Sequence, residues 1–464
     1  MNIKKGALLE LAIENMAFGG HGVARVEGFV LFVRGGVRGD RLLARVIRKK
    51  KDYAEARVVE LIEPSPDRIA APCPYHGHCG GCQWQHVQYG RQLDFKRQQV
   101  MEAVARIGGL PHVPVHATIP SENIYSYRNK MEFSFSDRRW LLPHEMGVEG
   151  LETDFALGLH APGTFYKVID IEACLLQHDT GNRILRKVRE IVRETGLPPY
   201  GIRSHQGFWR YLTLRYSSAF DEWMVNVVTS SENLPVLNHI ADVLGRSFPA
   251  VRTVVNNINS RKAGIAVGEK ELCISGPGFI RDRIGPYTFQ VSANSFFQTN
   301  TSGADRLYRK VAEYAELTGS EKVLDLYSGT GTIPIYLSKE AESVVGMEIA
   351  ESAVMDAVKN CRDNDVHCCR FILGDIKENL KNLDWSPDVL IIDPPRAGMH
   401  KKVAARVMEL GAERVVYVSC NPGTMARDLS LLADRYEVLE IQPVDMFPHT
   451  YHVESVAKLV VRKS

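Results

Sequence analysis

Two short apolar runs near the end of the chain are each followed by a residue with a chemically reactive side chain. Residues 391–396 (IIDPPR) contain Asp393, residues 418–422 (VSCNP) contain Cys420, and Glu454 follows in the same part of the chain. Each run is typical of a buried strand that ends in polar residues and prolines. In open α/β sheets, ligands bind at the carboxyl ends of the strands. We therefore expect one thiol and two carboxylates to face a pocket rather than the core.

A thiol opposite a carboxylate suits methylation of carbon 5 of a pyrimidine, which is too poor a nucleophile to react without covalent activation. The Cys420 thiolate would add to carbon 6, and the resulting enolate would take a methyl group from a sulfonium donor. Glu454 would then remove the proton from carbon 5 as general base, and elimination would release the thiol. Asp393 would hydrogen-bond near the uracil edge or the methionine part of the donor. The alternatives are a core cysteine at 420 and an ordinary salt bridge for Glu454.

The residues around Asp393 narrow the choice of target. Asp-Pro-Pro after the fourth strand of a sheet recurs in methyltransferases, and enzymes that methylate exocyclic amines usually follow it with an aromatic residue. Arg396 follows here, which argues against amine methylation. Methylation of cytosine carbon usually places a cysteine in or near this loop, whereas here the thiol comes one strand later, as Cys420.

A glycine-rich turn earlier in the chain predicts the site of the methyl donor. Residues 323–332 (VLDLYSGTGT) are typical of a strand, a turn and a helix start, and glycine lets the backbone approach a ligand closely. Pro334 breaks the G-x-G-x-x-G pattern of dinucleotide binding. Glu348, at the end of the next strand, would accept both ribose hydroxyls of S-adenosylmethionine, and Asp375 would lie by its adenine. A nicotinamide enzyme is the rival interpretation.

Strands and helices alternate from residue 286 onward, which predicts a doubly wound parallel sheet. The closing strands, 436–442 and 452–461, are joined by a loop too short for a crossover helix, so they should be antiparallel. We therefore predict a multidomain α/β protein whose last domain, 286–464, is Rossmann-like and dependent on S-adenosylmethionine.

Residues 1–64 predict a small β-barrel. Five short strands separated by glycine turns have the spacing of oligonucleotide-binding barrels. The region holds 12 Lys and Arg against 8 Asp and Glu, and its basic run 48–51 suits phosphate contacts. Residues 20–25 and 33–41 resemble a TRAM domain, an RNA-binding barrel appended to RNA-modifying enzymes. A barrel used only for packing is the alternative.

Three cysteines within ten residues predict a metal site in the central domain, 65–285, which we expect to be α+β. Cys73, Cys79 and Cys82 have five and then two residues between them, and Cys174 is the natural fourth ligand. On spacing alone, four thiolates suit zinc and a 4Fe–4S cluster equally, and this spacing disfavours radical chemistry. Cysteines without a ligand are the alternative.

Two strands of the central domain mix aromatic and basic residues. Residues 127–135 and 208–216 alternate polar with apolar side chains. Bases stack on aromatic rings while Arg and Lys hold phosphates, so we predict that both strands face RNA. A half-buried strand of any α+β domain has a similar composition. Residues 138–153, which lie between these strands, match no motif.

The motifs together resemble the RNA (uracil-5-)-methyltransferase family, and most closely its iron–sulfur branch that modifies 23S ribosomal RNA. The resemblance covers essentially the whole chain and rests on residues 392–396, 419–422, 295–298 and 452–454, with the TRAM-like start and the cysteines. It implies that Cys420 is the nucleophile and Glu454 the base. It implies cofactor contacts from Gln298, Tyr327, Thr332, Glu348, Asp375 and Asp393, although the family often has Asn at the position of Thr332. It also implies that Cys73, Cys79, Cys82 and Cys174 hold a 4Fe–4S cluster, with zinc as the alternative.

Composition sets the remaining expectations. The 464 residues are 45% hydrophobic and 24% charged, with a net charge of +2. There is no basic-then-apolar leader and no run of about 18 apolar residues, so we expect a cytoplasmic protein without membrane contact. We expect a monomer whose partner is RNA, 23S rRNA above others, and not DNA. The competing functions are a tRNA or dual-site uracil-5 methyltransferase, and a non-catalytic RNA-binding or assembly protein.

Overall fold

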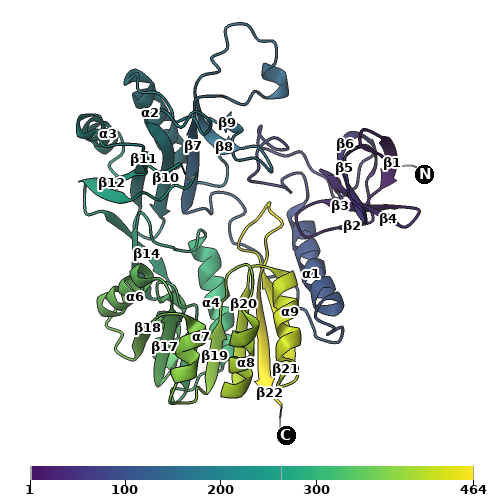
Figure 1. The fold of residues 1–464 in the computed structure, drawn as a ribbon, viewed down its shortest axis with the longest axis vertical. Helices are drawn as coiled ribbons and strands as arrows, with labels where there is room; N and C mark the ends of the chain where they lie inside the picture. Colours follow the sequence, from purple (N-terminus) through teal and green to yellow (C-terminus); the bar gives the residue numbers. More distant parts are fainter. Residues whose placement is uncertain (1–2, 263, 463–464) are drawn as a thin grey trace. The chain divides into compact units, whose positions relative to one another are not determined.

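The computed structural model describes residues 3–262 and 264–462, which form two compact units (Figure 1). The first unit combines Met1–Gly77, Cys82–Ser121 and Ile392–Ser464, and the second combines His78–Gly81 and Glu122–Ile391. Segments from both ends of the chain therefore fold together in the first unit. Every described helix is too short or too polar to cross a lipid bilayer.

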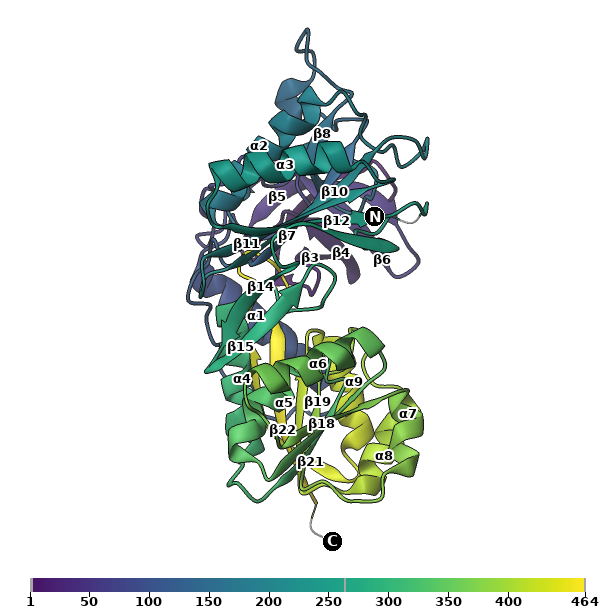
Figure 2. The same ribbon diagram turned by 90° about the vertical axis from the view of Figure 1, so that its left-hand side faces the viewer.

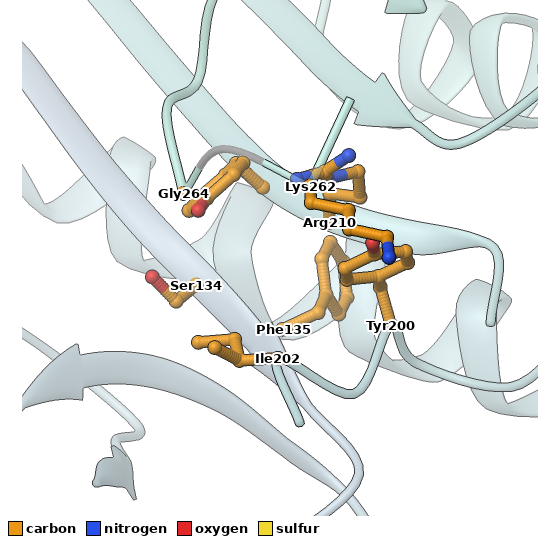
Figure 3. A pocket seen from close by; sticks show the side chains of 8 residues that line it. Ser134, Phe135, Tyr200, Ile202, Arg210, Lys262 and Gly264 are labelled. Carbon is orange, nitrogen blue, oxygen red and sulfur yellow. The ribbon is translucent and has the colours of Figure 1, made fainter. Parts of the chain in front are cut away.

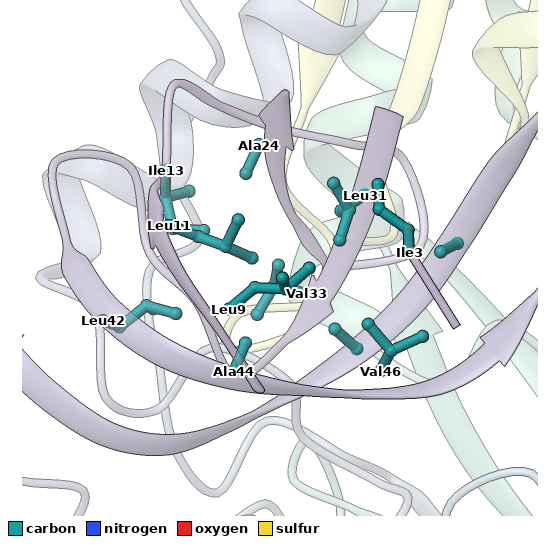
Figure 4. Packing of buried hydrophobic residues seen from close by; sticks show 12 residues of the cluster. Ile3, Leu9, Leu11, Ile13, Ala24, Leu31, Val33, Leu42, Ala44 and Val46 are labelled. Carbon is teal, nitrogen blue, oxygen red and sulfur yellow. The ribbon is translucent and has the colours of Figure 1, made fainter. Parts of the chain in front are cut away.

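The N-terminal residues form a six-stranded sheet around an apolar core of its own. The strands are β1 Leu8–Ala12, β2 Asn15–Met16, β3 Gly22–Val26, β4 Phe29–Arg34, β5 Arg41–Lys49 and β6 Tyr53–Glu63, in the order β1-β5-β6-β4-β3-β2. Side chains of a strand alternate between its two faces, and Leu9, Leu11, Leu31, Leu42 and Val46 are among those that fill the interior (Figure 4). The five predicted strands are confirmed, and the two-residue β2 is added to them.

Helix α1, Tyr89–Arg106, belongs to the first unit and packs on α9, Pro422–Leu432 (Figure 1). Its buried side chains include Phe95, Lys96 and Val100. The Phe95 ring meets Trp84 edge-on, with 5.9 Å between the ring centroids. A lysine in this buried stripe is unusual, because Lys is almost never fully buried unless its charge is paired.

The second unit contains a seven-stranded sheet that α3 packs against, with α2 beside α3 (Figure 2). The helices are α2 Asp179–Glu194 and α3 Leu234–Ser247. The strands are β7 Lys130–Ser136, β8 Ala156–His160, β9 Val168–Asp170, β10 Trp209–Ser217, β11 Glu222–Thr229, β12 Val251–Ile258 and β13 Lys270–Ser275, in the order β13-β12-β11-β10-β7-β8-β9. Only β11 and β12 are parallel among the described pairs of this sheet, which has the expected α+β character.

Strand β10 corrects one expectation. Its segment was predicted to face RNA, but every β10 side chain except the partly exposed Tyr216 is buried. The Arg210 guanidinium donates to the carbonyl oxygens of Asn259 and Arg261 (both 2.6 Å), and that of Arg215 donates to the carbonyl oxygen of Ser295 (2.5 Å). These arginines bind backbone oxygens of their own chain, so the prediction that this strand holds phosphates is wrong.

The C-terminal sheet has the strand order β18-β17-β16-β19-β20-β22-β21. Its strands are β16 Lys322–Leu326, β17 Ser343–Glu348, β18 Cys369–Leu373, β19 Val389–Ile392, β20 Arg414–Ser419, β21 Tyr436–Val444 and β22 Glu454–Val461. Strands β16, β17 and β18 are parallel, whereas β22 runs antiparallel to both β20 and β21, as predicted. The helices of this part are α4 Thr301–Ala315, α5 Thr332–Leu337, α6 Glu351–Asp363, α7 Ile376–Asn379, α8 Lys401–Leu410 and α9, and the hairpin β14 Phe279–Ile284 and β15 Tyr287–Ser292 precedes them. The alternation confirms the doubly wound fold.

Candidate active site

Cys420 lies in the turn between β20 and α9, where the strand ends and the helix begins. Asn421 is the N-cap of α9, and its side-chain oxygen accepts an amide of the first turn, the usual way in which a helix start is satisfied. The Asn421 side-chain nitrogen donates to the carbonyl oxygen of Arg396 (3.3 Å), and the Thr424 hydroxyl donates to the same oxygen (3.2 Å). These bonds tie the Cys420 turn to the loop that follows Asp393.

Burial and neighbouring charges raise the pKa values of three groups here. Burial, and then the charge of Asp393, raise the pKa of Glu454 to about 8, while Arg396 and Lys96 lower it. Burial raises the pKa of Asp393 to about 6. Burial, followed by the charge of Glu454, raises the pKa of Cys420 to about 11, and the charge of Arg396 opposes this increase. Because these groups act on one another, they share one electrostatic environment.

The predicted nucleophile and the predicted base are therefore both protonated at neutral pH. Cys420 and Glu454 both retain their protons at pH 7, since their pKa values lie above it. The Glu454 side chain begins β22 and is 8% exposed, so water does little to stabilise its ionised form. A strongly perturbed carboxyl group beside a perturbed thiol is typical of a functional site. The structure brings the predicted nucleophile, the predicted base and Asp393 together.

The glycine turn after β16 lies in the second unit and requires glycine at one position. Gly331 has a φ of +77°, and a Cβ there would lie 2.8 Å from the ring of Phe371 and 2.9 Å from the Cβ of Ala357. Real Cβ atoms do not approach other atoms so closely, and a positive φ is itself costly for other residues. Any larger residue at position 331 would therefore clash with Phe371 and Ala357, so the turn before α5 requires glycine there.

The Glu348 carboxylate, at the end of β17, is held by backbone amides. Its Oε2 accepts the amide of Gly329 (3.0 Å), and its Oε1 accepts those of Ile349 and Ala350 (2.8 and 2.9 Å). A carboxylate oxygen has room for about two hydrogen bonds. Oε2 thus retains one acceptor position, which fits the hydroxyl of a ligand such as a ribose.

The other predicted cofactor residues of the second unit have varied surroundings. Tyr327 has a φ of +67° in the turn. Thr332 shares a 2.9 Å hydrogen bond with Tyr308. Asp375 is exposed and caps α7 through a 2.8 Å bond to one of its amides, and Gln298 is half-buried in the loop before α4. Glu348, Gly331 and these residues all belong to the second unit.

Comparison with known proteins identifies the family. The sequence profile described as tRNA (uracil-5-)-methyltransferase matches residues 279–462, and the TRAM domain profile matches residues 4–59. An uncharacterized RNA methyltransferase from Chlorobaculum tepidum is 41% identical over an alignment that covers 98% of this chain and 96% of the relative. The chain belongs to the RNA (uracil-5-)-methyltransferase family.

The similarity to further relatives covers nearly the whole of this methyltransferase. An uncharacterized RNA methyltransferase from Halalkalibacterium halodurans is 37% identical and covers 99% of this chain and 98% of its own length. The structure of a Pyrococcus abyssi tRNA (uracil-54, C5)-methyltransferase in complex with S-adenosyl-L-homocysteine is 31% identical, with a TM-score of 0.76, and covers 97% of this chain and 99% of that protein. The N-terminal sheet is therefore a TRAM domain, and the C-terminal sheet is the methyltransferase fold.

The predicted cysteine cluster receives no support from the structure of this methyltransferase. Cys73 and Cys82 belong to the first unit, whereas Cys79 and Cys174 belong to the second. Gln85 donates its side-chain amide to the Cys82 sulfur (3.2 Å). Within residues 3–262 and 264–462, no group of three or more His, Cys, Asp or Glu side chains is arranged to hold a metal ion. The prediction of a 4Fe–4S cluster or zinc at these four residues is therefore not supported.

A buried ion pair beside Glu454 was not predicted from the sequence. Lys96 Nζ donates to Asp445 Oδ1 (2.6 Å) and to the carbonyl oxygen of Phe447 (3.0 Å), and both charged side chains are fully buried. The Tyr89 hydroxyl donates to Asp445 Oδ2 (2.9 Å). These bonds anchor the segment that leads into Glu454 to helix α1. A lone Lys in a helix is usually solvated, so the sequence gives no signal for this role.

A second buried carboxylate, Asp428 of α9, holds the loop after Asp393. Asp428 Oδ2 accepts the Tyr417 hydroxyl and the Met399 amide (both 2.6 Å), and Oδ1 accepts the Arg427 guanidinium (2.6 Å). The side chain is fully buried. Because the loop and α9 are joined in this way, the positions of Asp393 and of the Cys420 turn depend on Asp428. No local pattern in the sequence distinguishes Asp428 from other acidic residues of a helix.

Proposed function

We propose that this methyltransferase transfers a methyl group from S-adenosylmethionine to carbon 5 of a specific uridine in 23S ribosomal RNA. The observation that carries the proposal is the grouping of Cys420, Glu454 and Asp393 at strand ends, where the charge of Asp393 raises the pKa of Glu454 and both carboxylates raise that of Cys420. Family membership supports the reaction. The Pyrococcus abyssi relative carries S-adenosyl-L-homocysteine, which is the donor after loss of its methyl group.

In the proposed mechanism, Cys420 loses its proton to solvent and its sulfur bonds to carbon 6 of the uracil. Arg396 favours the thiolate, since its cation lowers the pKa of Cys420. S-adenosylmethionine supplies the methyl group that carbon 5 takes. The Glu454 carboxylate then removes the carbon 5 proton, the sulfur–carbon bond breaks, and the aromatic ring and free thiolate are restored.

Donor binding is assigned to Gln298, Tyr327, Thr332, Glu348, Asp375 and Asp393. The open acceptor position on Glu348 Oε2 supports a contact with a ribose hydroxyl, and the space that Gly331 leaves supports close approach to the turn. Asp393 would bond the uracil edge or the methionine part of the donor. No role in this proposal is given to a metal.

The proposed division of labour follows three domains. Residues 1–64 would bind RNA, residues 65–285 would hold the substrate, and residues 286–464 would transfer the methyl group. The TRAM match supports an RNA partner. We further propose that the protein acts as a cytoplasmic monomer.

Transfer RNA is the second candidate substrate. It is favoured by the similarity to the Pyrococcus abyssi tRNA (uracil-54, C5)-methyltransferase, which extends over 97% of this chain. Mass spectrometry of 5-methyluridine in ribosomal and transfer RNA from a deletion strain separates the two. We expect a loss at one position of 23S rRNA. A loss confined to tRNA would replace the ribosomal assignment, and no loss in either RNA would refute the proposed function.

The catalytic assignment is tested with the purified protein. Cys420→Ala is expected to abolish methyl transfer while RNA binding persists, because the substitution removes the only attacking atom and no surface charge. Residual formation of 5-methyluridine by this variant would refute Cys420 as the nucleophile. A non-catalytic RNA-binding protein would show RNA binding without methyl transfer already in the wild type.

A further inference from the structure

A basic and aromatic pocket lies in the second unit, outside the residues assigned to methyl transfer. It has a volume of about 350 Å³, and its lining includes Arg138, Arg139, Trp140, Tyr166, Lys167 and Arg203. We refer to it as the Trp140 pocket. The volume is at the small end of the range for ligand sites, and it suits a group of the size of one nucleotide.

The aromatic walls of the Trp140 pocket are unusually exposed. Trp140 is 41% and Tyr166 39% exposed, and large aromatic side chains on a surface commonly mark binding sites. Lys167 Nζ lies 3.7 Å from the centroid of the Trp140 ring, and the Arg203 guanidinium lies 4.8 Å from that of Tyr166. Each ring thus has a cation over one of its faces, and a base would stack on the opposite face. An aromatic face next to a cation is the arrangement that binds a base and its phosphate.

The wall that carries Trp140 is fixed to the sheet. The Trp140 amide donates to the carbonyl oxygen of Val168 (2.8 Å), and the Arg139 amide donates to that of Thr153 (2.8 Å). The Arg139 side chain forms ion pairs with Glu145 and Asp170. Arg139 therefore serves the structure of segment 138–153, and the backbone of Trp140 is fixed to β9.

The remaining cations of the pocket are not neutralised by carboxylates. Arg138, Lys167 and Arg203 form no ion pair with an acidic side chain in the part of the chain that the structure describes. Asp137 is the one acidic residue of the lining. Three cations against one carboxylate leave an excess of positive charge, which complements a phosphate.

The cavity next to the Trp140 pocket cannot take the ligand. It shares Ile202 with the pocket but encloses only about 10 Å³, room for about one water molecule. The Arg210 guanidinium lies 4.2 Å from the Tyr200 ring, and both side chains line this small cavity (Figure 3). The backbone bonds of Arg210 keep this wall closed. A ligand therefore fits in the Trp140 pocket but not in the neighbouring cavity.

We propose that the Trp140 pocket binds one unpaired nucleotide of the substrate RNA, with the base stacked on Trp140 and the phosphate held by Arg138 and Arg203. The identity of that RNA rests on the proposed function. Single-stranded nucleotides suit this site because their bases are free to stack, whereas paired bases are not. Segment 138–153, which matches no sequence motif, acquires a role as a specificity element that is separate from the residues of methyl transfer.

Binding of fluorescein-labelled oligouridylate to the full-length protein tests the proposal. Trp140→Ala is expected to weaken binding about tenfold, the usual cost of losing one stacked base, while Trp140→Phe retains most of the affinity. Arg203→Ala should reduce the slope of log affinity against log salt by about 0.7, as expected for one lost phosphate contact. Arg246→Ala is the matched control, because Arg246 is an exposed arginine of α3 that lies outside the lining.

Methyl transfer provides the second readout. Trp140→Ala should raise KM for RNA and leave kcat unchanged, since the pocket contains no reacting group. Wild-type affinity in Trp140→Ala, or a pocket that binds polyglutamate instead of oligouridylate, would overturn the proposal. If the wild type methylates no uridine but Trp140→Ala still weakens oligouridylate binding, the proposed function is wrong and nucleotide binding by the Trp140 pocket is retained. Intact methylation by Trp140→Ala with an unchanged KM for RNA would refute the pocket and leave the proposed function standing.

Discussion

The buried pair of Lys96 and Asp445 allows a quantitative test of how the site is held. Lys96→Met keeps the length of the side chain and removes its charge, which leaves the Asp445 carboxylate buried with the hydroxyl of Tyr89 and the amide of Phe447 as its remaining donors. Removing one partner of a buried ion pair typically costs about 3–5 kcal/mol, because an uncompensated charge stays behind. We expect a loss of stability in that range.

Urea denaturation followed by tryptophan fluorescence measures this loss, because Trp84 packs edge-on against Phe95 of the same helix as Lys96. The double variant Lys96→Met/Asp445→Leu is the matched control. Replacing both charges by apolar groups of similar volume is often nearly neutral, so the double variant should recover most of the lost stability. A single variant no less stable than the double one would refute the view that the pair is electrostatically coupled.

The same substitution has a predicted effect on catalysis. Burial raises the pKa of Glu454, and Lys96 is one of the two cations that oppose this increase. Without Lys96 that pKa should rise above about 8, so the rising limb of the pH–rate profile for methyl transfer should move to higher pH. If Lys96 only supports the fold, the rising limb of the pH–rate profile will not move. This outcome would refute an electrostatic effect of Lys96 on Glu454.

Further predictions concern individual groups. Glu454→Gln should accumulate a covalent RNA–protein adduct on denaturing gels, since elimination needs the carbon 5 proton removed; normal turnover would exclude Glu454 as the base. Folding raises the pKa of Glu454 from its ordinary value of 4.5 to about 8. The free energy of unfolding should therefore fall as the pH rises from about 4.5 to about 8, by at most about 5 kcal/mol. The urea denaturation midpoints of Glu454→Gln should not show this fall. Gly331→Ala should destabilise the protein by about 1–3 kcal/mol and weaken donor binding in calorimetry, because its Cβ collides with the Phe371 ring; unchanged affinity would contradict the assignment of the turn. Asp428→Asn should cost about 1.5–3 kcal/mol, as expected for lost bonds to a charged group, and lower kcat through the Cys420 turn; an unchanged thermal midpoint would show that Asp428 does not hold this loop.

The sequence was most informative where chemistry and strand ends coincide. Asp393 and Cys420 directly follow β19 and β20, and polar residues at the end of an apolar strand are visible without a structure, whereas Glu454 is the first residue of β22. The antiparallel closing pair was also predictable, because a short loop admits no other connection. Local pattern therefore predicted the order of the elements and the residues that are proposed to react.

Features that depend on distant parts of the chain were not predictable in this way. Lys96 and Asp445 are 349 positions apart, and neither residue has a local pattern that reveals its partner. The alternation in β10 was misread for a related reason: it indicates two different faces, but it does not say that packing covers both of them. The cysteine spacing suggested a metal site, yet spacing along the chain does not fix where thiols lie in space.

The raised pKa values of Cys420 and Glu454 fit the proposed sequence of steps better than two lowered values would. The Glu454 carboxylate opposes ionisation of the thiol, so the thiolate forms most easily while Glu454 still carries its proton. Once the sulfur is bonded to carbon 6, it no longer carries a negative charge, and Glu454 can ionise without facing a thiolate. At no stage does the mechanism require both groups to be negative together. Bond formation to carbon 6, which removes the thiolate charge, therefore favours the ionised form of Glu454 at the step where the base is needed.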